Sequence, residues 1–382
     1  MKRLGCMMLA LALSLSVFAC TVSATEPAYP GKSWCLIDAA TGTVLQAYNE
    51  HESLAPASVT KIMTLLLIME AIDSGASNWT DAVTASEAAA AKGGSQVYLK
   101  VGETMTVEEM VKSIAVSSAN DCACAMAEHL AGSESAFVDK MNAKAAQLGM
   151  NDTHFVNCTG LDDDPAAKAH KTSAYDIALM SRELLTKHPD IKKFTTIWMD
   201  SVRNGTFGLS NTNKLVRFYD GCTGLKTGFT SSAGYCLSAS AQRSGMELIA
   251  VVMGCATSND RFSACRQMLD YGFAGYALYT AETPLADPIP VKLGSAESVT
   301  AVPQQSLSLL VPKSELSSLN VRVELAESLT APVEQGQTVG ELTVLKNDEV
   351  LASIPMVAQT DVARLSFGDL FRELLGKVAM AK

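Results

Sequence analysis

The stretch ASVTKIMTLLLIMEAI, residues 57–72, carries Ser58 and Lys61 three positions apart at the start of an apolar run. The apolar residues that follow recur at helical spacing, at positions 62, 65, 66, 68, 69 and 72. This spacing predicts a buried helix that begins near Ser58. Three residues along a helix place both polar side chains on one face. Taken alone, the pair fits either a helix start with a solvated lysine or a nucleophile with its base.

The second interpretation has a clear chemical basis. A serine hydroxyl is a weak nucleophile and needs a nearby base to accept its proton. A lysine can be that base if burial and neighbouring positive charge lower its pKa. The backbone N–H of a residue at a helix start has no intrahelical acceptor, so the N–H of Ser58 is available to a developing oxyanion.

The first residues predict the compartment. Lys2 and Arg3 precede an apolar run of about 15 residues, which is short for a membrane span, and small residues follow up to Ala24. We interpret residues 1–24 as a secretory signal peptide, with lipoprotein processing at Cys20 as the alternative. Without Lys2 and Arg3 the formal charge changes from −10 to −12, which is unfavourable for binding nucleic acid.

The mature chain keeps eight of the ten cysteines. Export permits disulfides, but eight cysteines allow roughly a hundred pairings and the sequence does not choose among them. No CxxC pair indicates a metal site. We interpret most of the cysteines as small buried apolar residues, and we expect no metal and no cofactor.

The order of predicted elements indicates an α+β fold. Apolar runs on either side of AATG predict a hairpin at residues 33–49, and a second hairpin is predicted at 234–255 around RSG. Helical stretches lie between them, and Thr106 and Glu109 have the spacing of a capping box. We therefore expect a domain over residues 25–280 whose antiparallel sheet joins strands that are distant in sequence.

The composition changes near residues 281–290. Short alternating runs such as VRVEL and VGELTVL then predict a small all-β domain over 287–360. The last residues, 361–382, place apolar side chains among arginine and lysine, which predicts an amphipathic helix. Such a helix could lie on a membrane surface or dock on the β domain.

Two further motifs favour catalysis. SSAND contains Ser118 and Asn120 in an S-x-N triplet, and GLKTGFT contains K-T-G at Lys226–Gly228. The S-x-N pattern is weak, because it recurs at residues 318–320. In contrast, S-x-x-K and K-T-G each occur once. S-x-x-K, S-x-N and K-T-G in this order are the active-site set of penicillin-binding proteins and serine β-lactamases.

Within that group the chain resembles the low-molecular-mass D-alanyl-D-alanine carboxypeptidases, peptidase family S11, from about residue 30 to 273. Stretches such as LIDAATGTVL, GGSQVYLKVGE and FVNCTGLDDD add to the resemblance. It implies a β-lactamase/DD-peptidase-like fold, an antiparallel sheet with a helical subdomain. It also implies a bacterial exported enzyme that trims the terminal D-alanine of peptidoglycan stem peptides and is acylated by β-lactams. The sequence leaves open a periplasmic or a Gram-positive surface location.

The resemblance also implies the role of each residue. Ser58 is the nucleophile, Lys61 its base, and Ser118 with Lys226 passes a proton to the leaving D-alanine. The remaining predicted binding residues hold the substrate amide, the terminal carboxylate and the oxyanion: Asn120, Thr227, Gly228, the backbone N–H of Phe229, and Arg261. Two positions depart from the common family pattern, Ala119 for glycine and Phe229 for histidine. The second departure could alter substrate or inhibitor preference.

Two alternatives remain for comparison. A class A β-lactamase needs a glutamate on the loop between S-x-N and K-T-G, and FVNCTGLDDDPAAKAH has no Glu-x-x-x-Asn. A non-catalytic wall-binding protein would have no need for the complete set of catalytic residues. The sequence therefore favours a carboxypeptidase.

Overall fold

The first region of the computed structural model is built on a five-stranded antiparallel sheet. The structure describes residues 29–284, 286–369 and 371. The strand order is β2-β1-β9-β8-β7. The strands are β1 (Ser33–Asp38), β2 (Val44–Tyr48), β7 (Cys222–Thr230), β8 (Gly234–Arg243) and β9 (Met246–Cys255). Both predicted hairpins are confirmed, and β1 pairs with β9, so the sheet joins strands from both ends of the region.

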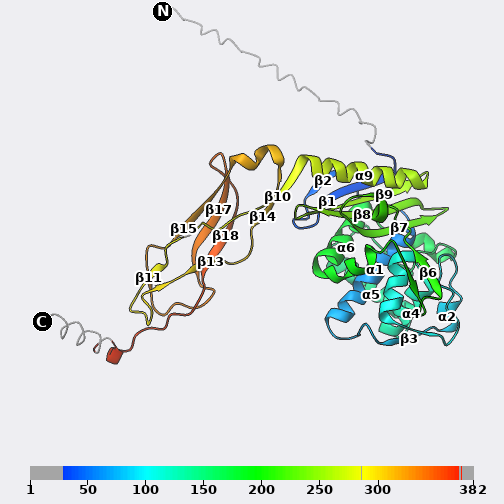
Figure 1. The fold of residues 1–382 in the computed structure, drawn as a ribbon, viewed down its shortest axis with the longest axis horizontal. Coiled ribbons are helices and arrows are strands. Elements are labelled where there is room, and N and C mark those ends of the chain that lie inside the picture. The colour runs from blue at the N-terminus through cyan, green and yellow to red at the C-terminus, as the bar shows by residue number, and fades with distance from the viewer. Residues whose placement is uncertain (1–28, 285, 370, 372–382) are drawn as a thin grey trace, which may run out of the picture.

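Helices cover both faces of this sheet (Figure 1). Helix α9 (Ser258–Gly275) lies on one face and buries a core against the sheet around Met268 and Leu269. The other face packs against a larger helical layer whose core includes most of α1 (Lys61–Asp73). The remaining elements of this layer are α2 (Glu87–Ala90), α3 (Val107–Ser117), α4 (Asn120–Ala131), α5 (Glu134–Gln147), η2 (Pro165–Ala169), α6 (Ala174–Lys187), η3 (Pro189–Ile191), α7 (Lys192–Thr195) and α8 (Leu215–Phe218).

Local sequence signals explain where these helices begin. The predicted capping box is present at α3, because Thr106 accepts from the N–H of Glu109 and Glu109 accepts from that of Thr106. The helix predicted from Ser58 begins instead with a 3₁₀ turn, η1 (Ala57–Thr60), and α1 starts at Lys61. Side chains three residues apart are eclipsed in a 3₁₀ turn, so this start still holds Ser58 and Lys61 together.

Two short ribbons complete the first region. They pair β3 (Ala82–Thr84) with β4 (Thr104–Thr106) and β5 (Met199–Val202) with β6 (Phe207–Ser210).

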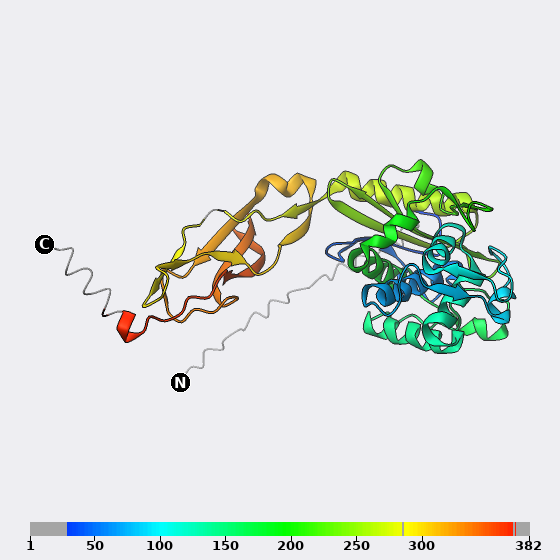
Figure 2. The ribbon, with the colours of Figure 1, turned by 60° about the horizontal axis from the view of Figure 1, so that its bottom comes forward.

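The second region is all-β, as predicted, and extends away from the first in both views (Figures 1 and 2). Its first strand, β10 (Tyr276–Thr280), follows α9 directly and pairs with β14 (Ser308–Pro312). A four-stranded sheet has the order β13-β18-β17-β15 and a three-stranded sheet the order β12-β11-β16. These elements are β11 (Ile289–Lys292), β12 (Ser298–Val299), β13 (Ala301–Pro303), η4 (Lys313–Ser318), β15 (Leu319–Leu325), β16 (Leu329–Thr330), β17 (Thr338–Lys346) and β18 (Glu349–Ala358).

The predicted terminal helix over 361–382 falls mostly outside the described residues. Within the part of the chain that the structure describes, none of the helices is long and apolar enough to cross a membrane.

Candidate active site

Ser58 lies in the η1 turn directly before α1, and its side chain is half-buried. Lys61, the first residue of α1, is fully buried. The Nζ atom of Lys61 is 3.1 Å from the Oγ atom of Ser58, which is hydrogen-bond distance. The structure therefore brings together the two residues that the sequence singled out, with the serine facing solvent and the lysine held inside.

The environment of Lys61 suits a base. Its Nζ also donates to the backbone carbonyl of Thr159 at 2.8 Å, which fixes the amine in place. Burial lowers the pKa of Lys61 to about 7, against a smaller opposing effect of Cys158 and Asp121. Near neutral pH a large fraction of this amine is therefore uncharged and able to accept the Ser58 proton.

The S-x-N triplet forms a tight bend between α3 and α4. Ser118 has the left-handed conformation, with φ 66°, and Asn120 is the first residue of α4. The Nδ2 atom of Asn120 donates to the Gly93 carbonyl at 2.7 Å. The Ser118 hydroxyl and the Asn120 Oδ1 atom are buried and have no hydrogen-bond partner within the described part of the chain. Buried polar atoms without partners are costly, so this pair beside the S-x-x-K turn suggests places for substrate groups.

Lys226, Thr227 and Gly228 lie on β7, the edge strand of the sheet, and all three are buried. Burial lowers the pKa of Lys226 well below its usual value, and the positive charges of Lys61 and Arg261 lower it further. The Lys226 Nζ donates to the Thr227 carbonyl at 2.9 Å. A Cβ atom on Gly228 would lie 2.7 Å from the Pro56 carbonyl oxygen, so the glycine allows β7 to approach the η1 turn.

A chain of contacts connects β7 with the S-x-N bend. The Thr227 hydroxyl donates to the Thr212 hydroxyl at 2.7 Å, and the Thr212 N–H donates to the Val116 carbonyl near the end of α3. The three motifs therefore lie close together: Gly228 of K-T-G packs against the η1 turn that carries Ser58, and the Thr227–Thr212–Val116 contacts connect K-T-G with the end of α3 beside S-x-N. The second S-x-N match, at residues 318–320, lies in the all-β region, at the η4–β15 junction.

Phe229 and Arg261 differ in burial: Phe229, on β7, is exposed, and Arg261, on α9, is buried. The Phe229 ring is about half exposed and stacks on Tyr235, with ring centroids 4.3 Å apart. Arg261 is buried, and its guanidinium donates to the carbonyls of Gly228 (2.9 Å) and Cys236 (3.3 Å). Arg261 is thus a buried residue in the first turn of α9 that holds the K-T-G strand from behind. Its Nε has no partner within the described residues.

Sequence reasoning missed the loop that completes the site. The Asn157 Oδ1 atom accepts from the N–H groups of Thr159 and Gly160, and this turn aims the Thr159 carbonyl at Lys61. Gly160 has φ 82°, and a Cβ atom there would collide with the Ala57 carbonyl. The run Asn157-Cys158-Thr159-Gly160 begins with asparagine and ends with glycine, a turn signal that could have identified the loop, although not its contact with Lys61.

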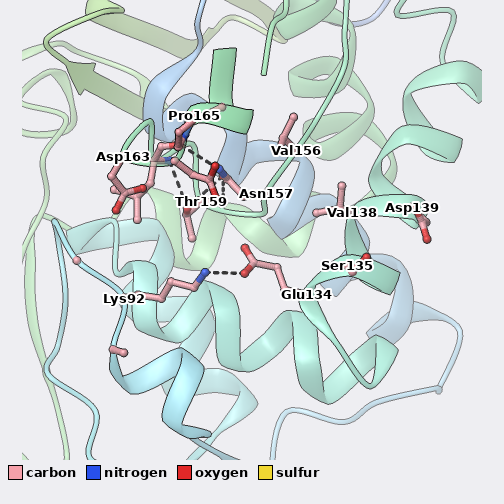
Figure 3. Close-up of a pocket in the computed structure, with 15 residues that line it drawn as sticks. Lys92, Glu134, Ser135, Val138, Asp139, Val156, Asn157, Thr159, Asp163 and Pro165 are labelled. Atoms are coloured by element: carbon pink, nitrogen blue, oxygen red, sulfur yellow. Dashed lines mark hydrogen bonds and ion pairs between the residues drawn. The ribbon is translucent and has the colours of Figure 1, made fainter. Parts of the chain in front are cut away.

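A cavity of about 650 Å³ lies on the far side of this loop. Figure 3 shows the Lys92–Glu134 ion pair across the cavity from Asn157 and Thr159. Glu134 also accepts from the N–H of Cys158 at 3.2 Å, so the ion pair is hydrogen-bonded to the backbone of the loop and helps to hold it in place. None of the predicted catalytic residues lines this cavity.

The acidic run at residues 162–164 is used structurally. Asp162 accepts from the Ser232 hydroxyl, which joins the loop to the β7–β8 turn, and Asp164 caps η2. Across residues 29–284, 286–369 and 371, no group of three or more His, Cys, Asp or Glu side chains is placed to hold a metal ion. The eight cysteines in these ranges are free thiols, and all but Cys222 are buried.

Comparisons with known proteins agree with this arrangement. Residues 20–257 match the model of the peptidase S11 family, D-alanyl-D-alanine carboxypeptidase, and residues 273–364 match that of the penicillin-binding protein 5 C-terminal domain. The D-alanyl-D-alanine carboxypeptidase DacF of Bacillus subtilis is 43% identical over 359 residues, 92% of this chain and 91% of the relative.

Solved structures show the same likeness. Penicillin-binding protein 5 of Haemophilus influenzae superposes with a TM-score of 0.75 at 30% identity, covering 89% of this chain and 99% of that one. Penicillin-binding protein D2 of Listeria monocytogenes, solved in an ampicillin-bound form, superposes with a TM-score of 0.59 at 29% identity, covering 65% and 99%. The fold class expected from the sequence is thereby confirmed.

Proposed function

The chain belongs to the peptidase S11 family of D-alanyl-D-alanine carboxypeptidases, and we propose that it removes the terminal D-alanine of peptidoglycan stem peptides through an acyl-enzyme on Ser58. It is a serine-type carboxypeptidase of the penicillin-binding group. The observation that carries the residue assignment is the 3.1 Å contact between Ser58 Oγ and a buried Lys61 whose pKa is lowered to about 7.

The reaction follows from these positions in two steps. Lys61 takes the hydroxyl proton as Ser58 Oγ attacks the carbonyl of the penultimate D-alanine, and the peptide bond breaks as a proton reaches the leaving amine. Ser118 and Lys226 relay that proton, because the Ser118 hydroxyl is without a partner among the described residues and Lys226 is close enough for the charge of Lys61 to lower its pKa. Water then hydrolyses the ester and restores Ser58.

The binding groups fit a peptide that ends in a carboxylate. The unpartnered Oδ1 of Asn120 is free to accept from a substrate amide N–H. The Thr227 hydroxyl and the positive field of Lys226 serve the carboxylate, and Arg261 strengthens that field from behind Gly228. The backbone N–H groups of Ser58 and Phe229 form the oxyanion hole.

β-Lactams are covalent inhibitors in this proposal. The ampicillin-bound form of the Listeria relative supports it, since that protein shares the fold of the first region. The exposed Phe229 ring belongs to a residue whose backbone N–H is a proposed oxyanion donor, and we infer that its replacement of the more common histidine affects which acyl groups are accepted.

The chain is proposed to be exported after removal of residues 1–24 and to act on the outer side of the bacterial membrane. We propose a catalytic domain over 25–280, a β domain over 287–360 and a membrane-binding segment over 361–382. The strand β10, at the end of the first range, pairs with β14 of the second. Deletion from Asp361 onward should release the protein from membranes, and unchanged membrane association would contradict the membrane-binding assignment.

The test is D-alanine release from a peptide ending in Lys-D-Ala-D-Ala, with Ser58→Ala beside the wild type. We expect at least about a 10³-fold loss in the variant. The control is Ser53→Ala, at an exposed serine five residues earlier, which should keep full activity. A Ser58→Ala variant that still releases D-alanine at the wild-type rate would reject the nucleophile, and an inactive wild type would reject the substrate.

A further inference from the structure

The residue before the proposed nucleophile has an unusual backbone. Ala57 has φ 48°, in the left-handed region that alanine seldom adopts. Its carbonyl oxygen and the N–H of Ser58 belong to one planar peptide group, so the direction of the carbonyl fixes the opposite direction of the N–H. That N–H is one of the two oxyanion donors proposed above. A group that fixes the Ala57 carbonyl therefore also fixes the direction of this oxyanion donor.

A buried histidine outside the three motifs reaches this peptide group through one hydroxyl. The Thr60 Oγ1 atom donates to the Ala57 carbonyl at 2.8 Å, and the Nε2 atom of His170 is 2.8 Å from the same Oγ1 atom. On the other side of the ring, the N–H of Val156 donates to His170 Nδ1 at 3.1 Å.

The direction of every bond in this chain is determined. A backbone N–H can only donate, so Nδ1 of His170 accepts from Val156 and Nε2 carries the ring hydrogen. Nε2 then donates to Thr60, whose hydroxyl hydrogen is left for the Ala57 carbonyl. Hydrogen bonds in such a chain polarise one another, which strengthens the last one.

The surroundings keep His170 in this state. The residue is 3% exposed, and its ring meets the edge of Phe155 at a centroid distance of 5.6 Å. Burial lowers the pKa of His170 to about 4, so the ring is neutral at neutral pH. Gly160 packs against both the Ala57 carbonyl and Thr60, which leaves the peptide group little room to rotate.

We propose that His170 is a positioning residue, which acts through Thr60 to hold the Ala57–Ser58 peptide group and so aims the Ser58 N–H into the oxyanion hole. The inference rests on the proposed role of Ser58 as nucleophile. His170 touches neither Ser58 nor Lys61 through a hydrogen bond, and its effect on the reaction is carried by the backbone.

The experiment measures the second-order rate constant for acylation by a fluorescent penicillin, on folded full-length protein. Thr60→Val removes the hydroxyl while keeping the side-chain shape, and His170→Phe removes both ring nitrogens. We expect each to lower the rate about 10- to 100-fold, because the oxyanion donor is misaimed but not removed. His170→Gln, which keeps one donor and one acceptor, should recover most of the rate. In D-alanine release, kcat should fall more than KM rises.

The double variant decides between positioning and packing. If His170 acts through Thr60, His170→Phe combined with Thr60→Val loses no more than the larger single loss. Additive losses, or a Thr60→Val protein that acylates at the wild-type rate, would overturn the proposal even if the His170 variants are unstable. His51→Gln, at an exposed histidine, serves as the control. Ser58→Ala distinguishes the two failures. Acylation that persists in Ser58→Ala rejects the nucleophile and with it the premise of this inference, whereas loss of acylation in Ser58→Ala beside wild-type rates in Thr60→Val rejects the positioning role alone.

Discussion

The two regions of the molecule differ in what they bury. The first region encloses many polar and charged side chains, among them Lys61, Lys226, Asp121 and Arg261. Beyond Gly275, every buried residue in the described part of the chain is apolar. The second region is held together by ordinary strand alternation, as in β15, where half-buried and exposed residues take turns.

This contrast agrees with the proposal that catalysis takes place in the first region. Burying a charged or unpaired polar group costs free energy, and a fold accepts that cost where the group performs chemistry. In the first region the cost is concentrated around Ser58, in the buried lysines, in the unpartnered Ser118 hydroxyl and in the left-handed Ala57. The second region carries no comparable concentration. Stability and activity should therefore respond separately to substitutions in the two regions.

The largest expected effect compares two glycines with nearly the same backbone conformation. Gly160 has φ 82° and Gly336 has φ 84°, but a Cβ atom on Gly160 would collide with the Ala57 carbonyl, whereas one on Gly336 meets open space. Gly336→Ala should cost about 1 kcal/mol of unfolding free energy from strain alone and leave acylation unchanged. Gly160→Ala should lower the acylation rate of the folded protein about 100-fold, because the nucleophile's peptide group is displaced.

Acylation rates and chemical denaturation of both variants test this expectation. Equal losses of stability without an effect on acylation would mean that the Gly160 loop can move without disturbing Ser58.

This comparison also shows which parts of the site a sequence can reveal. Ser58 and Lys61 were predictable because they are neighbours in one turn, and the capping box at Thr106 because its partners are three residues apart. The hairpins followed from alternation, and α1 followed from helical periodicity. In each case the physical interaction is local, so the pattern is written into consecutive residues.

The parts that could not be predicted depend on the backbone or on distant segments. The acceptor for Lys61 is a backbone carbonyl, and any residue type at position 159 would carry one. A positive φ is expected at glycine, so nothing marks Ala57 in advance. His170 meets Thr60 across 110 positions, and its neighbours in sequence give no sign of that contact.

The second expected effect is a pH dependence of acylation, which follows if the buried Lys61 is the base, as proposed. Since the pKa of Lys61 is lowered to about 7, its neutral fraction rises about tenfold between pH 6 and pH 8. The acylation rate should rise with pH by the same factor and level off above about pH 8. The sign is upward because the reactive form is the deprotonated amine.

The measurement is acylation by penicillin at constant ionic strength from pH 5 to pH 9. His51→Gln is the control, because the hydrogen bond with the Asp152 carboxylate raises the pKa of this exposed histidine, which has no contact with the proposed catalytic residues among the described hydrogen bonds. A profile that is flat, or that rises only near pH 10 as for a solvated lysine, would contradict the role of burial at Lys61.

The smallest expected effect on turnover concerns the core of the second region. Leu342, on β17, is 1% exposed in an apolar core cluster of the second region. Leu342→Ala should lower that region's unfolding free energy by about 2–5 kcal/mol. Because all the proposed catalytic residues lie in the first region, kcat/KM for a soluble Lys-D-Ala-D-Ala peptide should stay within about twofold of the wild type. Leu351→Ala, at a residue 40% exposed on β18, is the matched control and should change stability by less than about 0.5 kcal/mol.

Calorimetry and D-alanine release on the same samples measure the unfolding free energy and the turnover of each variant. If Leu342→Ala lowered turnover in protein that is still folded, the second region would be supporting the active site through β10 and α9, and the separation between the two regions would be wrong.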